Sequence, residues 1–234
     1  MDLDEVTTRI LQKRAVISEA RSVLVGISGI DGSGKGYVAR QIEARLGQHG
    51  IAAATINVDG WLHLPEKRFD PAAPAQHFYD SAIRFDEFFA QLVKPLRDHR
   101  SVFLEADFTE ETASAYRKHT YKFKNVSVIL VEGIFLFKRG YRKLFDLAIW
   151  IDCSFPTALA RALARSQEGL PLAGMITAYE TIYFPAQRIH LDRDDPRSSA
   201  DLVLNNDMYL DKQRPVSLAP SPRQCLCGAL TAGI

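Results

Sequence analysis

The chain has 234 residues, 47% of them hydrophobic and 24% charged, a composition typical of a globular protein with a substantial core. With 29 Lys and Arg residues against 28 Asp and Glu residues, its net charge of +1 argues against a protein that binds nucleic acid through a basic surface. The N-terminus is too charged for a secretory signal, no apolar run is long enough to cross a membrane, and three cysteines make no disulfide framework, so we expect a cytoplasmic protein.

An amphipathic helix is predicted at residues 3–19, because Leu3, Val6, Ile10 and Ile17 fall on roughly one helical face. We expect this face to pack on the rest of the chain; a helix that binds a partner protein is the alternative. Residues 1–21 are therefore assigned to an N-terminal helix that precedes a single domain at 22–210.

A glycine-rich loop separates the first predicted strand from the helix that follows it. Residues 23–36 read VLVGISGIDGSGKG, a buried β-branched run followed by the pattern G-x-x-x-x-G-K. Glycine lets the backbone turn tightly against an anion, and the helix at 35–46 offers unpaired N–H groups and the positive end of its dipole. The pattern predicts a site for the phosphates of a nucleotide; an ordinary glycine turn is the alternative. The predicted phosphate-binding residues are Gly29, Ile30, Asp31, Gly32, Ser33, Gly34, Lys35 and Gly36.

Gly36 departs from this pattern. The position after the lysine is expected to carry Ser or Thr, whose hydroxyl binds magnesium, whereas glycine has no side-chain oxygen. We expect phosphate binding to survive this change, because the backbone makes most of the contacts, and metal placement to be weakened.

Asp59 follows a second predicted buried strand at residues 53–58. In open parallel sheets, ligands bind at the carboxyl ends of the strands, where Asp59 could accept a proton or hold a metal; a turn-capping aspartate is an equal alternative. The next residues, rich in proline and aromatics, are predicted to form a long loop over the sheet. A helix at 85–94 is expected to end at Pro95.

Glu132 ends the next clearly buried strand, predicted at residues 125–131. An acidic residue at such a strand end resembles the carboxylate that positions magnesium in phosphoryl transfer, and a stray acidic residue is the alternative. Before it, residues 101–108 are read as a short strand. Residues 110–124 either line a substrate site, with Arg117 and His119 among its side chains, or form a solvated excursion.

Two arginines lie four residues apart in the helix predicted at 156–167, after a strand at 147–151. Arg161 and Arg165 share a helical face and could clamp phosphate oxygens, although a solvated face is the alternative. A helix at 173–190 should be broken or kinked by Pro185, and a last strand is predicted at 200–204. Residues 211–234 are predicted to be a disordered tail. Strands that alternate with helices predict a three-layer α/β fold with a mainly parallel five-stranded sheet.

From Val23 to Asn206 the chain resembles the uridine kinase and phosphoribulokinase group of P-loop kinases. The resemblance is carried by GISGIDGSGKG, by the Asp59-led segment DGW, by VILVEGIFLF around Glu132 and by IDCSFPTALARALAR. It implies the P-loop NTPase fold with a helical lid, ATP and Mg²⁺ as cofactors, and phosphoryl transfer to a hydroxyl of a nucleoside or related small molecule. A homo-oligomer is compatible with it.

The resemblance also implies roles for individual residues. Asp59 would be the base or a metal-linked carboxylate, Glu132 would position magnesium, and Lys35, Arg161 and Arg165 would stabilise the transferring phosphate. The candidates for acceptor binding are Trp61, Tyr79, Arg117 and His119. Because Gly36 lacks the metal-binding hydroxyl, a nucleotide-binding protein with weak or no kinase activity is the alternative function.

Overall fold

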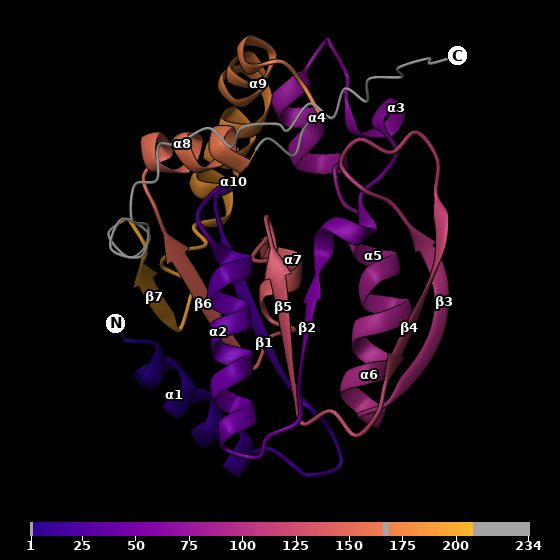
Figure 1. Ribbon diagram of the computed structural model, residues 1–234, viewed down its shortest axis with the longest axis vertical. Coiled ribbons are helices and arrows are strands. Elements are labelled where there is room, and N and C mark those ends of the chain that lie inside the picture. Colours follow the sequence, from indigo (N-terminus) through magenta and orange to yellow (C-terminus); the bar gives the residue numbers. More distant parts are fainter. Residues whose placement is uncertain (1, 166–168, 208–234) are drawn as a thin grey trace, which may run out of the picture.

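The computed structural model describes residues 2–165 and 169–207, and it contains the predicted parallel sheet (Figure 1). The strand order is β2-β5-β1-β6-β7, and every neighbouring pair is parallel. The predicted α/β fold is therefore confirmed. The strands are β1 (Val23–Gly29), β2 (Ala53–Asn57), β5 (Val128–Gly133), β6 (Leu147–Asp152) and β7 (Leu202–Asn205).

The two central strands are buried along their whole length, as their continuous apolar sequences predict. Every residue of β1 and of β5 is buried, which is expected of parallel strands covered on both faces. The register pairs Ile27 of β1 and Asn57 of β2 with the same residue, Glu132 of β5. The carboxyl ends of the three strands therefore meet at one edge of the sheet.

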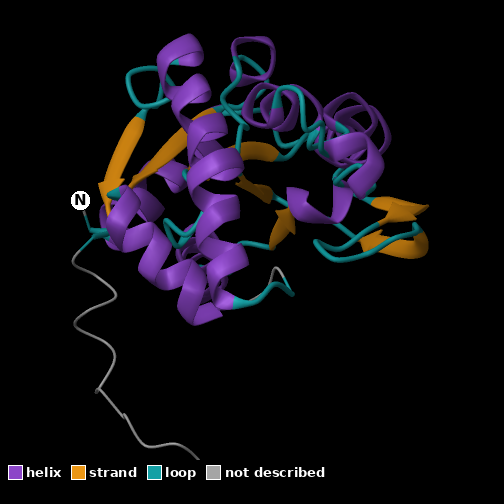
Figure 2. Cartoon of the chain, turned by 90° about the horizontal axis from the view of Figure 1, so that it is seen from above, coloured by secondary structure: helices purple, strands orange, loops and turns teal. Residues whose placement is uncertain are grey.

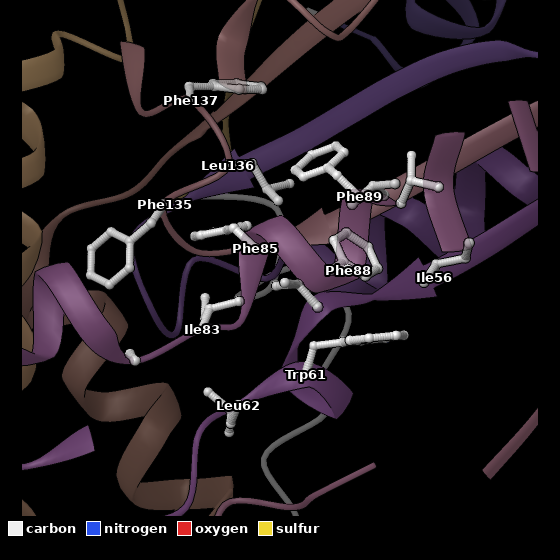
Figure 3. Close-up of a cluster of buried hydrophobic side chains, with 14 of the residues drawn as sticks. Ile56, Trp61, Leu62, Ile83, Phe85, Phe88, Phe89, Phe135, Leu136 and Phe137 are labelled. Carbon is white, nitrogen blue, oxygen red and sulfur yellow. The ribbon is translucent and has the colours of Figure 1, made fainter. Parts of the chain in front are cut away.

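One face of the sheet is covered by α1 (Leu3–Val16) and α2 (Lys35–Gln48), which share an aliphatic core with it (Figure 1). Val6 and Ile10 of α1 are fully buried in this core, so the N-terminal helix packs within the chain as expected. The opposite face has an aromatic core, in which Trp61, Phe88 and Phe89 lie close together (Figure 3). Helices on this face include α5 (Phe85–Phe88), α6 (Lys94–His99) and α7 (Arg139–Arg142).

Helices gather above the carboxyl edge of the sheet, at the top of Figure 1 and facing the viewer in Figure 2. The prediction of a long loop after β2 is wrong in part, because this segment folds into the 3-10 turn η1 and two helices. The elements at this edge are η1 (Val58–Trp61), α3 (Pro65–Arg68), α4 (Pro74–Ser81), α8 (Phe155–Arg165), α9 (Leu172–Ala178) and α10 (Phe184–Asp194).

A two-stranded antiparallel hairpin lies beside the main sheet. It joins the predicted strand β3 (Val102–Phe108) to β4 (Arg117–Phe123). Most residues of β4 are exposed, so the region is a largely solvated hairpin, in line with the solvated excursion considered for residues 110–124. The hairpin packs on η1, where a Cβ at Gly60 would lie only 2.5 Å from the Phe108 ring. Glycine at this position therefore lets the hairpin approach the turn that carries Asp59.

Two prolines lie inside helices rather than at their ends. Pro95 does not end the helix that starts at Phe85: a π turn, η2 (Phe89–Val93), leads directly into α6. A second π turn, η3 (Tyr179–Tyr183), precedes Pro185 in the same way and is the distortion predicted there. Proline lacks the N–H of the regular helical bond, and the wider turn accommodates its ring without ending the helix.

Within the described ranges, no helix combines the length and apolar character needed to cross a membrane. The tail predicted at 211–234 lies outside the described residues.

Candidate active site

The glycine-rich loop between β1 and α2 is shaped to receive an anion. Gly32 and Gly34 adopt φ values of 75° and 90°, a region that L-residues with side chains rarely occupy. Gly34 is the N-cap of α2, so no side chain caps the helix, and its first turn contains no acidic residue. The N–H groups at the start of this 14-residue helix are therefore directed toward the loop without a side-chain partner.

Lys35 brings a buried positive charge to this loop. Its side chain is 7% exposed, and Nζ donates to the backbone oxygen of Ile30 at 2.9 Å. No carboxylate of the described residues forms an ion pair with it. A bound anion would supply the negative partner that this ammonium group lacks.

Asp31 holds the loop against the helices above it. Its carboxylate accepts hydrogen bonds from the Gly32 N–H at 2.8 Å and the Tyr179 hydroxyl at 2.5 Å, and Arg165 lies 3.4 Å away. Burial alone would raise the pKa of Asp31, but Lys35, Arg165 and the Tyr179 hydroxyl lower it below its ordinary value. Asp31 thus remains ionised and links the loop to η3 and α8.

Glu132 lies at the end of β5, against the start of α2. Burial raises the pKa of its carboxyl group to about 7, the charge of Asp59 adds to the increase, and Lys35 opposes it. A Cβ built on Gly36 would lie 3.2 Å from Oε1 of Glu132. The position that lacks the hydroxyl therefore directly faces the carboxylate proposed to position the metal.

Asp59 lies in η1, next to the end of β2, and is exposed to solvent. The side chain that caps this turn is that of Asn57, whose Oδ1 accepts the Asp59 N–H at 2.6 Å, so the capping alternative for Asp59 is wrong. Surrounding protein atoms raise the pKa of Asp59, as does the charge of Asp31, whereas Lys35 lowers it. Asp59, Glu132 and Lys35 are therefore close enough to act electrostatically on one another.

These carboxylates do not form a complete metal cage. Among the described residues, no group of three or more His, Cys, Asp or Glu side chains is placed to hold a metal ion. Magnesium is commonly held by one or two carboxylates together with substrate phosphates and water. Glu132 and Asp59 fit this type of site, in which the nucleotide supplies further oxygen ligands.

The two arginines of α8 have different partners. Arg165 reaches Asp31 of the loop, whereas Arg161 donates to the backbone oxygen of Asn206 at 2.8 Å and lies against Cys153 at 3.3 Å. The described contacts therefore link Arg165, and not Arg161, directly to the loop, and the joint role of the two arginines as a phosphate clamp stays a prediction.

Asn206 and Tyr179 are site residues whose contacts sequence reasoning did not predict. The Asn206 amide donates to the backbone oxygen of Ser33 at 2.7 Å and fixes the loop to the end of β7. Tyr179 bonds to Asp31 from a turn 148 residues further along the chain. A polar residue at the end of a buried strand was the available signal for Asn206.

Two of the predicted acceptor residues are buried in the core. Trp61 is fully buried, stacks on Tyr121 at 6.0 Å between ring centroids and contacts Phe88 at 5.5 Å. Tyr79 is 4% exposed, and its hydroxyl donates to Asp194 at 2.6 Å. Neither side chain offers an open surface, so their prediction as acceptor contacts is wrong for this structure.

The other two predicted acceptor residues lie on the hairpin. The His119 ring packs against Phe108 and Tyr121, and both of these residues approach Gly60, next to Asp59. Arg117 is exposed on β4 and pairs with Glu110 at 2.6 Å. The Arg117 guanidinium also lies 4.5 Å from the centroid of the Phe108 ring, so both predicted residues contact the ring that approaches Gly60.

The model of the Phosphoribulokinase / Uridine kinase family matches residues 24–182 of this chain. A uridine kinase from Staphylococcus haemolyticus is 25% identical over 190 residues, which are 79% of this chain and 88% of the relative.

Two solved structures have a similar fold. A possible uridine kinase from Bacillus stearothermophilus has a TM-score of 0.67 and 22% identity, covering 86% of this chain and 96% of its own. A candidate fructose transport system kinase from Silicibacter sp. TM1040 has a TM-score of 0.68 and 19% identity. The match covers 87% of this chain and 98% of the Silicibacter chain.

Proposed function

The chain belongs to the phosphoribulokinase and uridine kinase family of P-loop kinases, and from this premise we propose that it transfers a phosphoryl group from ATP to a hydroxyl of a nucleoside or related small molecule. The observation that carries the proposal is the convergence of Lys35, Asp59 and Glu132 beside an uncapped helix N-terminus. Phosphoryl transfer depends mainly on positioning and charge stabilisation, which this arrangement provides.

Each charged residue has a part in the proposed reaction. The backbone N–H groups of the loop and Lys35 would bind the phosphates of ATP, and Arg165 would approach them from α8. Asp59, open to solvent at the end of β2, would accept the proton of the attacking hydroxyl.

Glu132 would hold magnesium, which would neutralise phosphate charge when bound. Its carboxyl group must lose a proton to do so, and its pKa of about 7 makes this loss incomplete at neutral pH in the absence of the metal. Magnesium binding should therefore tighten as the pH rises from about 6 to about 8.

The test is an ADP-release assay with nucleosides, pantothenate and sugar phosphates as trial acceptors. We expect turnover that requires ATP, magnesium and one class of acceptor. A protein that binds ATP but shows no acceptor-dependent turnover with any of them would contradict the proposal.

Gly36 supports a second candidate, a nucleotide-binding protein with weak or no kinase activity. Under this alternative, ATP binding would depend little on magnesium, because position 36 contributes no oxygen. Calorimetry of ATP binding with and without magnesium separates the two, since strong metal dependence excludes the second candidate.

A further inference from the structure

Arg40 lies one helical turn after Gly36 in α2, and its side chain runs back toward the glycine. Its Nη1 atom lies 3.6 Å from the position of a Cβ built on Gly36. Side chains four residues apart lie on one face of a helix and are tilted toward its N-terminus, which explains this approach. Because Gly36 has no side chain, the guanidinium group can come close to the start of the helix.

The Arg40 guanidinium and the Glu132 carboxylate face the same space. Oε1 of Glu132 lies 3.2 Å from the Cβ position on Gly36 that Arg40 also approaches. Burial raises the pKa of Glu132, and the charge of Arg40, together with that of Lys35, opposes this increase. The space that a side chain at position 36 would fill is therefore bordered by one acidic group and one basic group.

Arg40 is exposed to solvent and forms no ion pair with any of the described residues. The one acidic residue of α2, Glu43, accepts a hydrogen bond from the Thr55 hydroxyl at 2.7 Å and does not pair with Arg40. A cation beside the N-terminus of a helix is unfavourable unless an anion binds there. The phosphates of a nucleotide in the loop would supply that anion.

We propose that Arg40 binds the phosphates of ATP across Gly36, and that it supplies part of the positive charge that a magnesium ion bound by Ser or Thr at position 36 would bring. The inference rests on the proposed function, because it concerns ATP bound in the phosphate loop. Arginine suits this role, since its guanidinium group donates to phosphate oxygens in pairs and remains charged at any working pH. Glycine at position 36 then leaves room for the guanidinium group.

The proposal makes ATP binding less dependent on magnesium than it would be without Arg40. The guanidinium group attracts the phosphates when no metal is present, and its charge repels a magnesium ion beside Glu132. Both effects have the same sign, because removing Arg40 weakens metal-free binding and increases the gain from magnesium. The quantity to measure is therefore the metal ratio, the dissociation constant of the nucleotide without magnesium divided by that with magnesium.

The test is calorimetry of the full chain with AMP-PNP, a non-hydrolysable analogue of ATP, in EDTA and in saturating magnesium. Arg40→Gln should weaken binding in EDTA by about 5- to 20-fold, the effect of losing one charged hydrogen-bonding partner at an open site. In magnesium the loss should stay below about twofold, so the metal ratio should rise several-fold. Arg40→Lys keeps the charge without the paired donors and should give a ratio between those of the wild type and Arg40→Gln.

Arg45→Gln is the matched control, because it makes the same exchange one turn further from the loop in the same helix. Arg45 pairs with Asp4 at 2.9 Å, away from the phosphate site. The variant changes the net charge by the same amount as Arg40→Gln. It should leave the metal ratio unchanged if Arg40 acts by direct contact with the phosphates.

An unchanged metal ratio in Arg40→Gln, or an equal rise in Arg45→Gln, would overturn the proposal. Neither arginine is buried, so both variants should fold. These titrations involve no phosphoryl transfer, and Arg40 can prove inert while acceptor-dependent turnover persists. Conversely, absent turnover together with a raised metal ratio in Arg40→Gln would count against the kinase proposal alone.

Discussion

Two buried carboxylates near the carboxyl edge of the sheet, Asp194 and Glu132, differ in their hydrogen-bond donors and in the direction of their pKa shifts. The Asp194 carboxylate accepts hydrogen bonds from the Tyr79 hydroxyl at 2.6 Å, from Nδ1 of His190 at 2.7 Å and from the Arg139 N–H at 3.1 Å. Burial would raise the pKa of Asp194, but these donors reduce it to about 2. Glu132, by contrast, has no hydrogen-bond donor among the described residues, and its pKa rises to about 7.

This difference distinguishes charges that stabilise the fold from charges whose partner would be a bound ligand. A carboxylate with a full set of donors is more stable ionised in the folded protein than in water. Unsatisfied like charges, such as Glu132 and Asp59, reduce stability and are commonly found at functional sites. Mutation of Asp194 should therefore lower the free energy of unfolding, whereas mutation of Glu132 or Asp59 should lower the activity.

The largest expected effect is that of Asp59→Asn on catalysis. Loss of a general base should reduce kcat by about 10²- to 10⁴-fold in the ADP-release assay. Because the variant also removes a charge that repels Glu132, its free energy of unfolding should be unchanged or slightly higher. If Asp59→Asn lowered the free energy of unfolding but kept its turnover, Asp59 would be a charge that stabilises the fold and not a catalytic one.

Asp194→Asn should lower the free energy of unfolding by about 2 kcal/mol at neutral pH, with kcat preserved in the folded protein. The folded pKa of Asp194 is depressed to about 2, so its stabilisation is complete above the ordinary pKa of about 4. It is lost as the pH falls from about 4 to about 2. Denaturant unfolding across this range should show that loss in the wild type and a smaller one in the variant.

Gly36→Ser addresses the missing hydroxyl directly. A side chain at position 36 would face Glu132, so the serine oxygen should add one magnesium contact and tighten metal binding in the presence of ATP by about tenfold. The matched control is Gly47→Ser in the same helix, where a Cβ would meet nothing within 4 Å. Equal metal affinity in the wild type and both variants would show that another ligand already fills this role.

The sequence predicted best the parts of the fold where one physical constraint dominates. Buried parallel strands need continuous apolar runs, so β1 and β5 were identified, and their common edge brings Glu132 toward the loop. β4 was missed because RKHTYKF (residues 117–123) is largely polar and pairs only with the hairpin strand β3. Pro95 misled the helix prediction, since a π turn can accommodate a proline.

Site residues were predicted where the backbone determines their position and missed where tertiary packing does. The loop glycines and Lys35 follow from local geometry. Trp61 was expected at the acceptor site, yet the aromatic core on that face buries it completely (Figure 3). The bond of Tyr179 to Asp31 joins distant segments and has no local signature.

The smallest expected effect is that of Arg117→Ala, which tests where the candidate site ends on the hairpin. Arg117 and its partner Glu110 are 59% and 63% exposed, and such surface pairs contribute about 0.2–1 kcal/mol. We expect a change in unfolding free energy within that range and a change of less than about twofold in the KM of the acceptor. Lys118→Ala, which breaks the neighbouring exposed pair with Asp107, is the control for general effects on the hairpin. A tenfold fall in kcat/KM confined to Arg117→Ala would show that this side chain contributes to the acceptor site, as the sequence-based hypothesis proposed.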